Sequence, residues 1–303
     1  MAPTVGSTLQ TLVERIANRE HVLEQMTTAS TNGGTTTTAV SSAAWRPNGY
    51  YEGLWLYVSA TNGSAAPYGE ERQVKQSTQT TSTLSLSYAM TAAIPNSATI
   101  QLYARWSRAQ IVHAINGAIR AAAGYWYQRV KDESTTTPSS TYTISLASLT
   151  VPVEERYGIL RVSYQGDEND ATYPWKRVTD WELLWSGTTP TLQFVSQYPS
   201  ARAVRLEYIA SPSTLSAATD KTGVVESYFD TFIEEYALFL LYQPRGSLAP
   251  TADKRTDSNL ANQHRDEAER IRRMHSMRQP NTRIRGKASQ LADDGKYLGW
   301  GDF

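Results

Sequence analysis

Residues 107–130 read SRAQIVHAINGAIRAAAGYWYQRV. Their apolar members recur at steps of three and four residues, which places them on one stripe of an α-helix. Ser107 can cap the N-terminus of this helix. Gly117 and Gly124 fall inside it, and helices keep such glycines mainly where another backbone comes close. The sequence therefore predicts a tightly packed helix in the middle of the chain. The stripe consists of Ile111, Ile115, Ile119, Ala122, Trp126 and Val130.

Three further segments have helical periodicity. The first runs from Thr8 to about Met26. The other two close the chain, at Val225–Tyr242, where Pro244 ends the pattern, and at Ala252–Met277. We expect these helices and the central one to pack together as a four-helix core.

Between the helices, the apolar pattern has the period of two that is typical of strands. From Trp45 to Tyr103 it predicts a small β module of four or five strands, with Asn62-Gly63 as a hairpin turn. From 133 to 210 it predicts five or six short antiparallel strands of a second, sandwich-like module. The threonine-rich segment Thr27–Thr38 has no periodicity, and we interpret it as a flexible linker.

These patterns predict an α+β fold, in which two antiparallel β modules are inserted into the connections of a four-helix core and an extended C-terminal tail follows. The expected segments follow in chain order. They are 1–30 (N-terminal core helix), 31–105 (small β module), 106–132 (core helix), 133–215 (β-sandwich-like module), 216–279 (two closing core helices) and 280–303 (extended tail).

The composition excludes several classes of functional site. The 303 residues include 29 basic and 29 acidic side chains, so the formal net charge is zero, and a broad electrostatic grip on nucleic acid is not expected. There is no cysteine, which excludes disulfides, thiolate zinc sites and thiol nucleophiles. No apolar run approaches the roughly 20 residues of a membrane helix. No secretory signal is visible in the first ten residues.

The search for catalytic and binding motifs finds none of the glycine-rich phosphate loops or nucleophile elbows of known enzyme classes. Asp167–Asp170 lacks the glycine and the closing glutamate of a calcium loop. The side chains of the adjacent pair Glu234-Glu235 diverge, which is poor geometry for an acid/base couple. We therefore expect a protein that is not an enzyme and needs no cofactor or metal. We interpret the four histidines as helix-surface residues; they are His21, His113, His264 and His275.

Two features remain open to a functional interpretation. The first is a group of tryptophans, Trp175, Trp181 and Trp185, which either stack on a sugar ring or fill the core of the sandwich-like module. The core interpretation is favoured because Trp181 and Trp185 share one face of a strand that has Glu182 on the other.

The second feature is a basic stretch of 18 residues without an acid, followed by an aromatic end. Three interpretations of the basic stretch are open. It binds nucleic acid phosphates, it docks on an acidic protein surface, or it is a solvated helix end whose positive charge is stabilised by the helix dipole. The residues concerned are Arg270, Arg272, Arg273, Arg278, Arg283, Arg285 and Lys287, with Tyr297, Trp300 and Phe303 in the tail.

Several segments of the chain resemble segments of a known class of proteins. Residues Trp45–Leu56 (WRPNGYYEGLWL), followed by Gly69–Val74 (GEERQV), resemble a β module common in structural proteins of tailed bacteriophages. Ala114–Ile119 (AINGAI) resembles the helix that follows that module. Tyr228–Tyr242 (YFDTFIEEYALFLLY), with 264–274 after it, is similar to the closing helices of phage head–tail adaptor (connector, neck) proteins. The resemblance extends from about residue 45 to 285.

The resemblance implies a non-enzymatic virion protein, made in the host cytoplasm, at the head–tail junction. Such adaptors form homo-oligomeric rings, commonly twelvefold, below the portal and continue the DNA channel toward the tail. The partners implied are other copies of the chain, the portal, a further neck or tail protein and non-specific DNA in the channel, but no membrane. By this analogy the basic stretch and the tail dock on a neighbour, with Trp300 and Phe303 as anchors. The alternative is a carbohydrate- or receptor-binding tail protein that uses the tryptophans.

Overall fold

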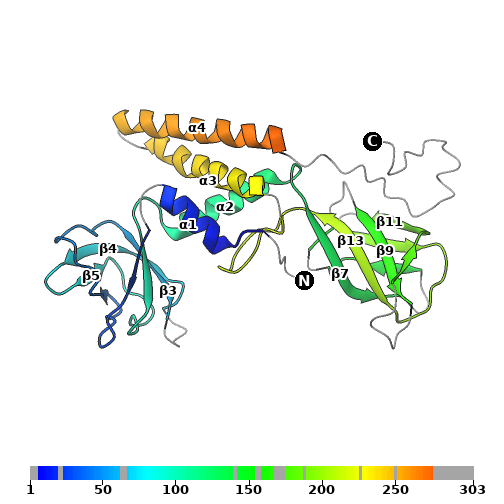
Figure 1. Ribbon diagram of the computed structural model, residues 1–303, viewed down its shortest axis with the longest axis horizontal. Coiled ribbons are helices and arrows are strands. Elements are labelled where there is room, and N and C mark those ends of the chain that lie inside the picture. Colours follow the sequence, from blue (N-terminus) through cyan, green and yellow to red (C-terminus); the bar gives the residue numbers. More distant parts are fainter. Residues whose placement is uncertain are drawn as a thin grey trace. The chain divides into compact units, whose positions relative to one another are not determined.

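The computed structural model divides the chain into two compact units, each built from separate pieces of sequence (Figure 1). The barrel unit consists of Leu9–Ala118 and Phe232–Ala268. The sheet-pair unit consists of Met1–Thr8, Ile119–Thr231 and Glu269–Phe303. The structure describes residues 6–19, 23–61, 67–138, 142–149, 151–153, 158–166, 175–186, 189–224, 227–248 and 251–275.

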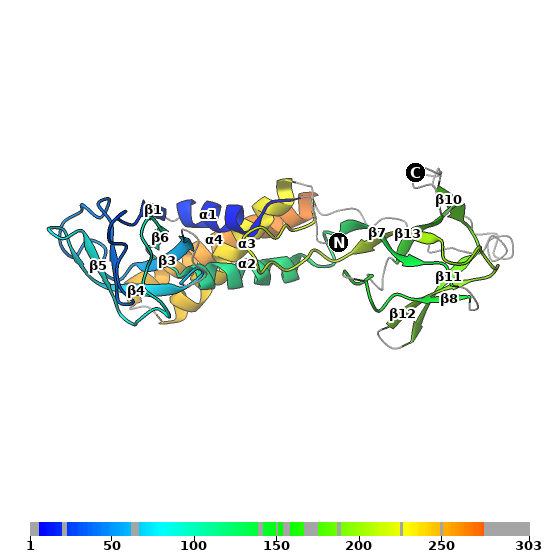
Figure 2. The same cartoon turned by 90° about the horizontal axis from the view of Figure 1, so that it is seen from below.

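The barrel unit is built on a six-stranded antiparallel sheet in the order β1-β6-β3-β4-β5-β2, which curls into a half-barrel (Figure 2). The sheet curls at β4, where a register shift falls between Val74 and Gln76 against β5. Alternating apolar side chains of the strands, including Leu56, Leu84 and Ile100, are buried in one core inside the curl. The strands are β1 (Leu23–Thr27), β2 (Thr38–Val40), β3 (Trp55–Ala60), β4 (Glu71–Thr78), β5 (Thr83–Leu86) and β6 (Thr99–Tyr103).

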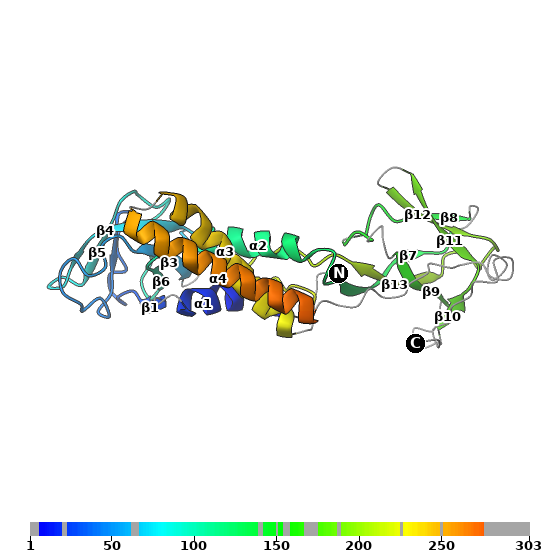
Figure 3. The same ribbon diagram turned by 90° about the horizontal axis from the view of Figure 1, so that it is seen from above.

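Four helices contribute to the barrel unit, and α3 and α4 lie side by side in it (Figures 1 and 3). Helix α1 buries Leu9, Leu12 and Ile16 completely. A Cβ added at Gly117 of α2 would lie 2.7 Å from Cδ1 of Leu240 on α3, so the helix is tightly packed there as predicted, but against a side chain rather than another backbone. The helices are α1 (Leu9–Arg19), α2 (Arg108–Ala122), α3 (Ser227–Leu248) and α4 (Thr251–His275); the last three continue into the sheet-pair unit.

The sheet-pair unit contains a four-stranded sheet in the order β10-β9-β13-β7 and a three-stranded sheet in the order β11-β12-β8, both antiparallel. One hydrophobic cluster draws Val162 and Leu206 from the first sheet and Ile144 and Leu192 from the second, so both sheets share a core. The strands are β7 (Gln128–Thr136), β8 (Thr143–Ser145), β9 (Ile159–Gln165), β10 (Trp175–Val178), β11 (Trp181–Ser186), β12 (Thr189–Phe194) and β13 (Ala203–Ala210).

The predicted fold class, a four-helix core with two inserted β modules, is wrong. Over the described residues, thirteen strands in antiparallel sheets accompany the four helices, and the half-barrel is a principal part of the fold rather than a small insertion. The threonine-rich segment is not a flexible linker. Thr28 is buried, its N–H donates to Ala98 O at 2.8 Å, and Gly33 N–H donates to Asn96 Oδ1 at 2.7 Å.

Two helices end earlier than their periodicity predicts. Helix α1 ends at Arg19, because the residues from Leu23 onward pair with β6 as β1. Helix α2 ends at Ala122, because Gly124 has a φ of +90°, a left-handed conformation that terminates helices and favours glycine. Trp126 and Val130 therefore do not continue the stripe of α2. By contrast, α3 extends to Leu248, beyond the end predicted at Tyr242.

Candidate functional site

The barrel unit contains a groove of about 870 Å³ beside the start of α2. Its walls come from β3, β4, the first three turns of α2 and the second half of α3, and small side chains of α2 keep it open. No carboxylate is among the lining residues. They are Gly53, Trp55, Gln73, Ala104, Arg105, Trp106, Ala109, Gln110, His113, Ala114, Gly117, Leu240, Leu241 and Gln243.

The start of α2 is fixed by a capping box formed by Ser107 and Gln110. The Gln110 N–H donates to Ser107 Oγ at 3.1 Å, and the Ser107 N–H donates to Gln110 Oε1 at 3.0 Å, so the predicted cap is confirmed. Glu71 of β4 accepts the next free donors, the N–H groups of Arg108 at 2.5 Å and Ala109 at 3.3 Å. Burial raises the pKa of Glu71, although these hydrogen bonds act against it. The contacts hold α2 against the sheet and so define the groove.

One wall of the groove is rigid because Arg105 is held from several sides. Its guanidinium donates to Asp257 Oδ1 at 2.6 Å and to Tyr242 Oη at 3.0 Å. The same group lies 4.6 Å from the ring centroid of Tyr242 and 5.3 Å from that of Trp106, and the two rings meet edge to face. Asp257 is buried, so this ion pair is shielded from water on its acidic side.

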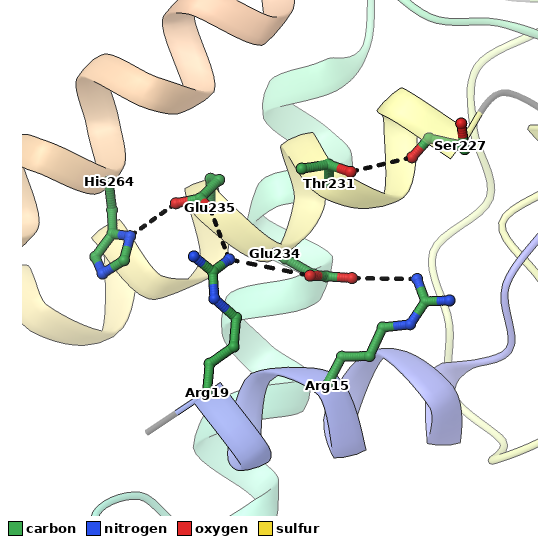
Figure 4. A network of polar contacts seen from close by, with 7 residues as sticks. All are labelled: Arg15, Arg19, Ser227, Thr231, Glu234, Glu235 and His264. Atoms are coloured by element: carbon green, nitrogen blue, oxygen red, sulfur yellow. Dashed lines mark hydrogen bonds and ion pairs between the residues drawn. The ribbon is translucent and has the colours of Figure 1, made fainter. Parts of the chain in front are cut away.

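A second polar network joins α1, α3 and α4 in the barrel unit (Figure 4). Glu235 of α3, whose side chain is 7% exposed, accepts hydrogen bonds from Arg19 at 2.6 Å and from His264 at 2.7 Å. Burial alone would raise the pKa of the Glu235 carboxyl, but the hydrogen bonds and charges of His264 and Arg19 outweigh burial and lower it. The neighbouring Glu234 pairs with Arg15 at 3.2 Å and also lies 4.0 Å from the Arg19 guanidinium, so the two carboxylates share Arg19 and do not diverge completely as predicted.

Large aromatic side chains are exposed on the half-barrel. Trp45, Tyr50, Tyr68 and Tyr88 are 58%, 50%, 52% and 77% exposed. The Arg46 guanidinium contacts two of them, 4.4 Å from the centroid of the Trp45 ring and 5.1 Å from that of the Tyr50 ring. Exposed Trp, Tyr and Arg side chains held in place by one another are typical of protein–protein contact surfaces. We call Trp45, Arg46 and Tyr50 the aromatic sandwich.

The basic stretch predicted as a docking site begins at the end of α4. Arg272 lies 4.4 Å from the ring centroid of Tyr125 and also contacts Glu269. Arg270 contacts the sulfur of Met274, and Arg273 is on the same last turns of α4. The remaining predicted residues lie outside the described residues, namely Arg278, Arg283, Arg285, Lys287, Tyr297, Trp300 and Phe303.

The three tryptophans of the alternative glycan site lie on two different sheets. Trp175 is on β10, under the Arg205 guanidinium at 3.9 Å. Trp181 and Trp185 are on β11, where Trp181 is only 4% exposed and belongs to the shared core. The burial of Trp181 agrees with the core interpretation for that residue, whereas Trp175 and Trp185 are half-buried.

Several of these features were not predicted from the sequence. His264 is not simply a surface residue, because it is mostly buried in the pair with Glu235, and His275 stacks on Tyr228 at 3.6 Å. His113 is exposed on α2, as expected, and His21 lies outside the described residues. The sequence signal for the His264 pair was the acidic pair on the apolar face of α3, which requires partners from neighbouring helices.

Within the described ranges, no group of three His, Asp or Glu side chains is placed to hold a metal ion. No helix in this part of the chain has the length and hydropathy to cross a membrane. Asp167–Asp170 and the Asn62-Gly63 turn fall outside the described residues. Comparison with known proteins finds no matching family model and no matching curated sequence.

Proposed function

We propose that this chain is a non-enzymatic virion structural protein, a head–tail adaptor that forms a ring between the portal of a phage head and its tail. The ring contains several copies of the chain, commonly twelve in the proteins it resembles. It continues the DNA channel from the head and is located at the head–tail junction. Its partners are the portal above and a further neck or tail protein below.

The observation that supports this proposal best is the aromatic sandwich. Trp45, Arg46 and Tyr50 belong to the segment whose sequence resembles the phage β module, and they project from the half-barrel in a preorganised stack. Such side chains lose little conformational entropy on binding, and they bury a large apolar area when a partner covers them. They suit a protein whose work is to contact other proteins.

The experiment compares assembly of two matched variants with the portal ring encoded in the same genome. Trp45→Ala/Tyr50→Ala removes exposed side chains of the half-barrel, and Tyr142→Ala removes a similarly exposed tyrosine of the sheet-pair unit. All variants should retain the wild-type far-ultraviolet circular dichroism. Negative-stain microscopy should show wild type and Tyr142→Ala on the portal and the double variant absent from it. Wild-type protein that never joins the portal would refute the proposal.

A further inference from the structure

The groove of the barrel unit is the least explained feature of the described chain. With a volume of about 870 Å³ it is within the range of binding sites, roughly 300–1,000 Å³, and larger than any one side chain fills. Its floor is apolar, with Trp55 on β3 and Leu240 on α3, both half-buried. Its α2 wall includes the small residues Ala109 and Ala114, which leave room beside the helix, whereas the space at Gly117 is taken by Leu240.

Charge and hydrogen bonding indicate what kind of occupant fits. The lining contains no acid, and its two basic side chains are Arg105, which is already paired with Asp257, and the exposed His113. The indole N–H of Trp106 is buried and has no acceptor among the described residues. A buried donor without an acceptor costs about 1–3 kcal/mol, so the wall favours an occupant that brings oxygen acceptors. The side-chain amides of Gln73 and Gln243 are exposed, and although Gln73 Nε2 already donates to Gly53 O at 3.0 Å, their other hydrogen-bonding groups suit a main chain.

The C-terminal segment of this chain has the complementary chemistry. Residues Leu291–Phe303 read LADDGKYLGWGDF, with three aspartates and one lysine, so the segment is acidic. Trp300 stands between Gly299 and Gly301, so a large apolar side chain is flanked by residues without side chains. From Ser276 to Phe303 there are 28 residues, which span up to roughly 90–100 Å when extended. That reach is long enough to extend onto a neighbouring molecule.

We propose that the groove binds the segment Leu291–Phe303 of a second copy of this chain, with Trp300 as the anchor over Trp55 and Leu240. The inference rests on the proposed ring function. Groove and segment are different surfaces of one chain, so each copy gives its segment to one neighbour and receives a segment from another. Repeated contacts of this heterologous kind close into a ring when the rotation between copies permits it.

The absence of cysteine from the chain permits a direct test, because introduced thiols have no native competitors. One full-length chain carries His113→Cys in the groove, and a second, differently tagged, carries Gly299→Cys in the segment. The matched control replaces the first chain by one with Arg120→Cys, an exposed residue of the same helix outside the groove. We expect the disulfide between the two chains to form at least about tenfold faster with His113→Cys. Equal rates would overturn the proposal.

A single chain that carries both His113→Cys and Gly299→Cys distinguishes the source of the segment. Cross-linked dimers and larger species are expected. A cross-link confined to one chain at all protein concentrations would show that the groove takes its own segment, and the second-copy proposal would be overturned.

A free peptide of residues Leu291–Phe303 tests the groove without assembly. Fluorescence anisotropy follows its binding to the full-length chain that carries Trp300→Ala. We expect saturable binding, weakened at least about tenfold by adding His113→Trp, which fills the groove, and unchanged by adding Arg120→Trp. No binding up to roughly 1 mM would overturn the proposal.

Microscopy of the same samples separates the two proposals. If rings form on the portal but the cross-link does not exceed its control, the groove assignment fails and the ring function stands. If the cross-link forms between chains but no ring joins the portal, the groove assignment stands and the proposed function fails.

Discussion

Glu235→Ala should destabilise the barrel unit much more than the same change at its neighbour Glu234. Glu235 accepts two charged hydrogen bonds from an almost fully buried position, and each such bond contributes about 1.5–3 kcal/mol. The contribution of Arg19 must be reduced because its side chain is 41% exposed. We therefore expect a loss of about 2–3 kcal/mol. Glu234 contacts Arg15, which is about half exposed, and lies 4.0 Å from Arg19, so the Glu234→Ala change should cost about 1 kcal/mol or less.

The lowered pKa of Glu235 predicts how its contribution to stability changes with pH. The folded-state pKa lies below the ordinary value of 4.5, so the native state binds the proton more weakly than the unfolded state. The stabilisation by Glu235 is therefore fully present above pH 4.5, and it is lost as the pH falls through the lowered folded-state pKa. The difference in unfolding free energy between wild type and Glu235→Ala should shrink over that acidic range.

The assay must report on one unit, because a single global probe would average over two compact units. Hydrogen exchange of peptides from α1 in increasing urea, read by mass spectrometry, gives the free energy of opening where Arg19 is held. Equal losses for the two alanine variants would refute the reasoning, as would a wild-type advantage that does not change with pH.

Three further predictions concern stability and assembly. Gly124→Ala should cost about 1–2 kcal/mol, because φ is +90° there although only Tyr127 Oη lies near the added Cβ; thermal unfolding measures this, and an unchanged midpoint would contradict it. Trp181→Ala should cost about 3–5 kcal/mol by opening a cavity in the shared core of the sheet-pair unit, as urea titration would reveal; a stable variant would show that this tryptophan is not a core residue. Deletion of Gly286–Phe303 should leave circular dichroism and thermal unfolding unchanged but abolish ring formation, and a truncated chain that assembles normally would contradict the role of the segment.

Local periodicity predicted most of the helices and strands, but it did not predict how much of the fold is β-sheet. Short antiparallel strands were predicted between 133 and 210, and that region contains β9, β11, β12 and β13. Such strands have strict alternation over several residues, which is the strongest signal for half-buried sheet.

The half-barrel was underestimated because its additional strands are short and polar. Thr38–Val40 pairs with β5 over only three residues, and Leu23–Thr27 has apolar spacing that suits a helix as well as a strand. In such segments, the partner strand decides the conformation rather than local propensity. Gly124 shows the same limit, since its positive φ rather than its spacing ends α2.

The candidate sites depend on contacts between residues far apart in sequence. Arg105 contacts Asp257, and Glu235 contacts both Arg19 and His264, across separations that no periodicity encodes. The aromatic sandwich lies within six residues, yet its exposure follows from the turn that holds Tyr51 inside and Tyr50 outside. The sequence identifies aromatic and basic residues as candidates, but only their packing shows which of them are exposed for contact and which are buried in the core.

The most direct measurement is electron microscopy of the wild-type chain mixed with the portal ring encoded in the same genome. The account predicts a closed ring of this chain beneath the portal, coaxial with the channel, with the half-barrel aromatic residues at an interface. Absence of the chain from the portal and from the virion would contradict it.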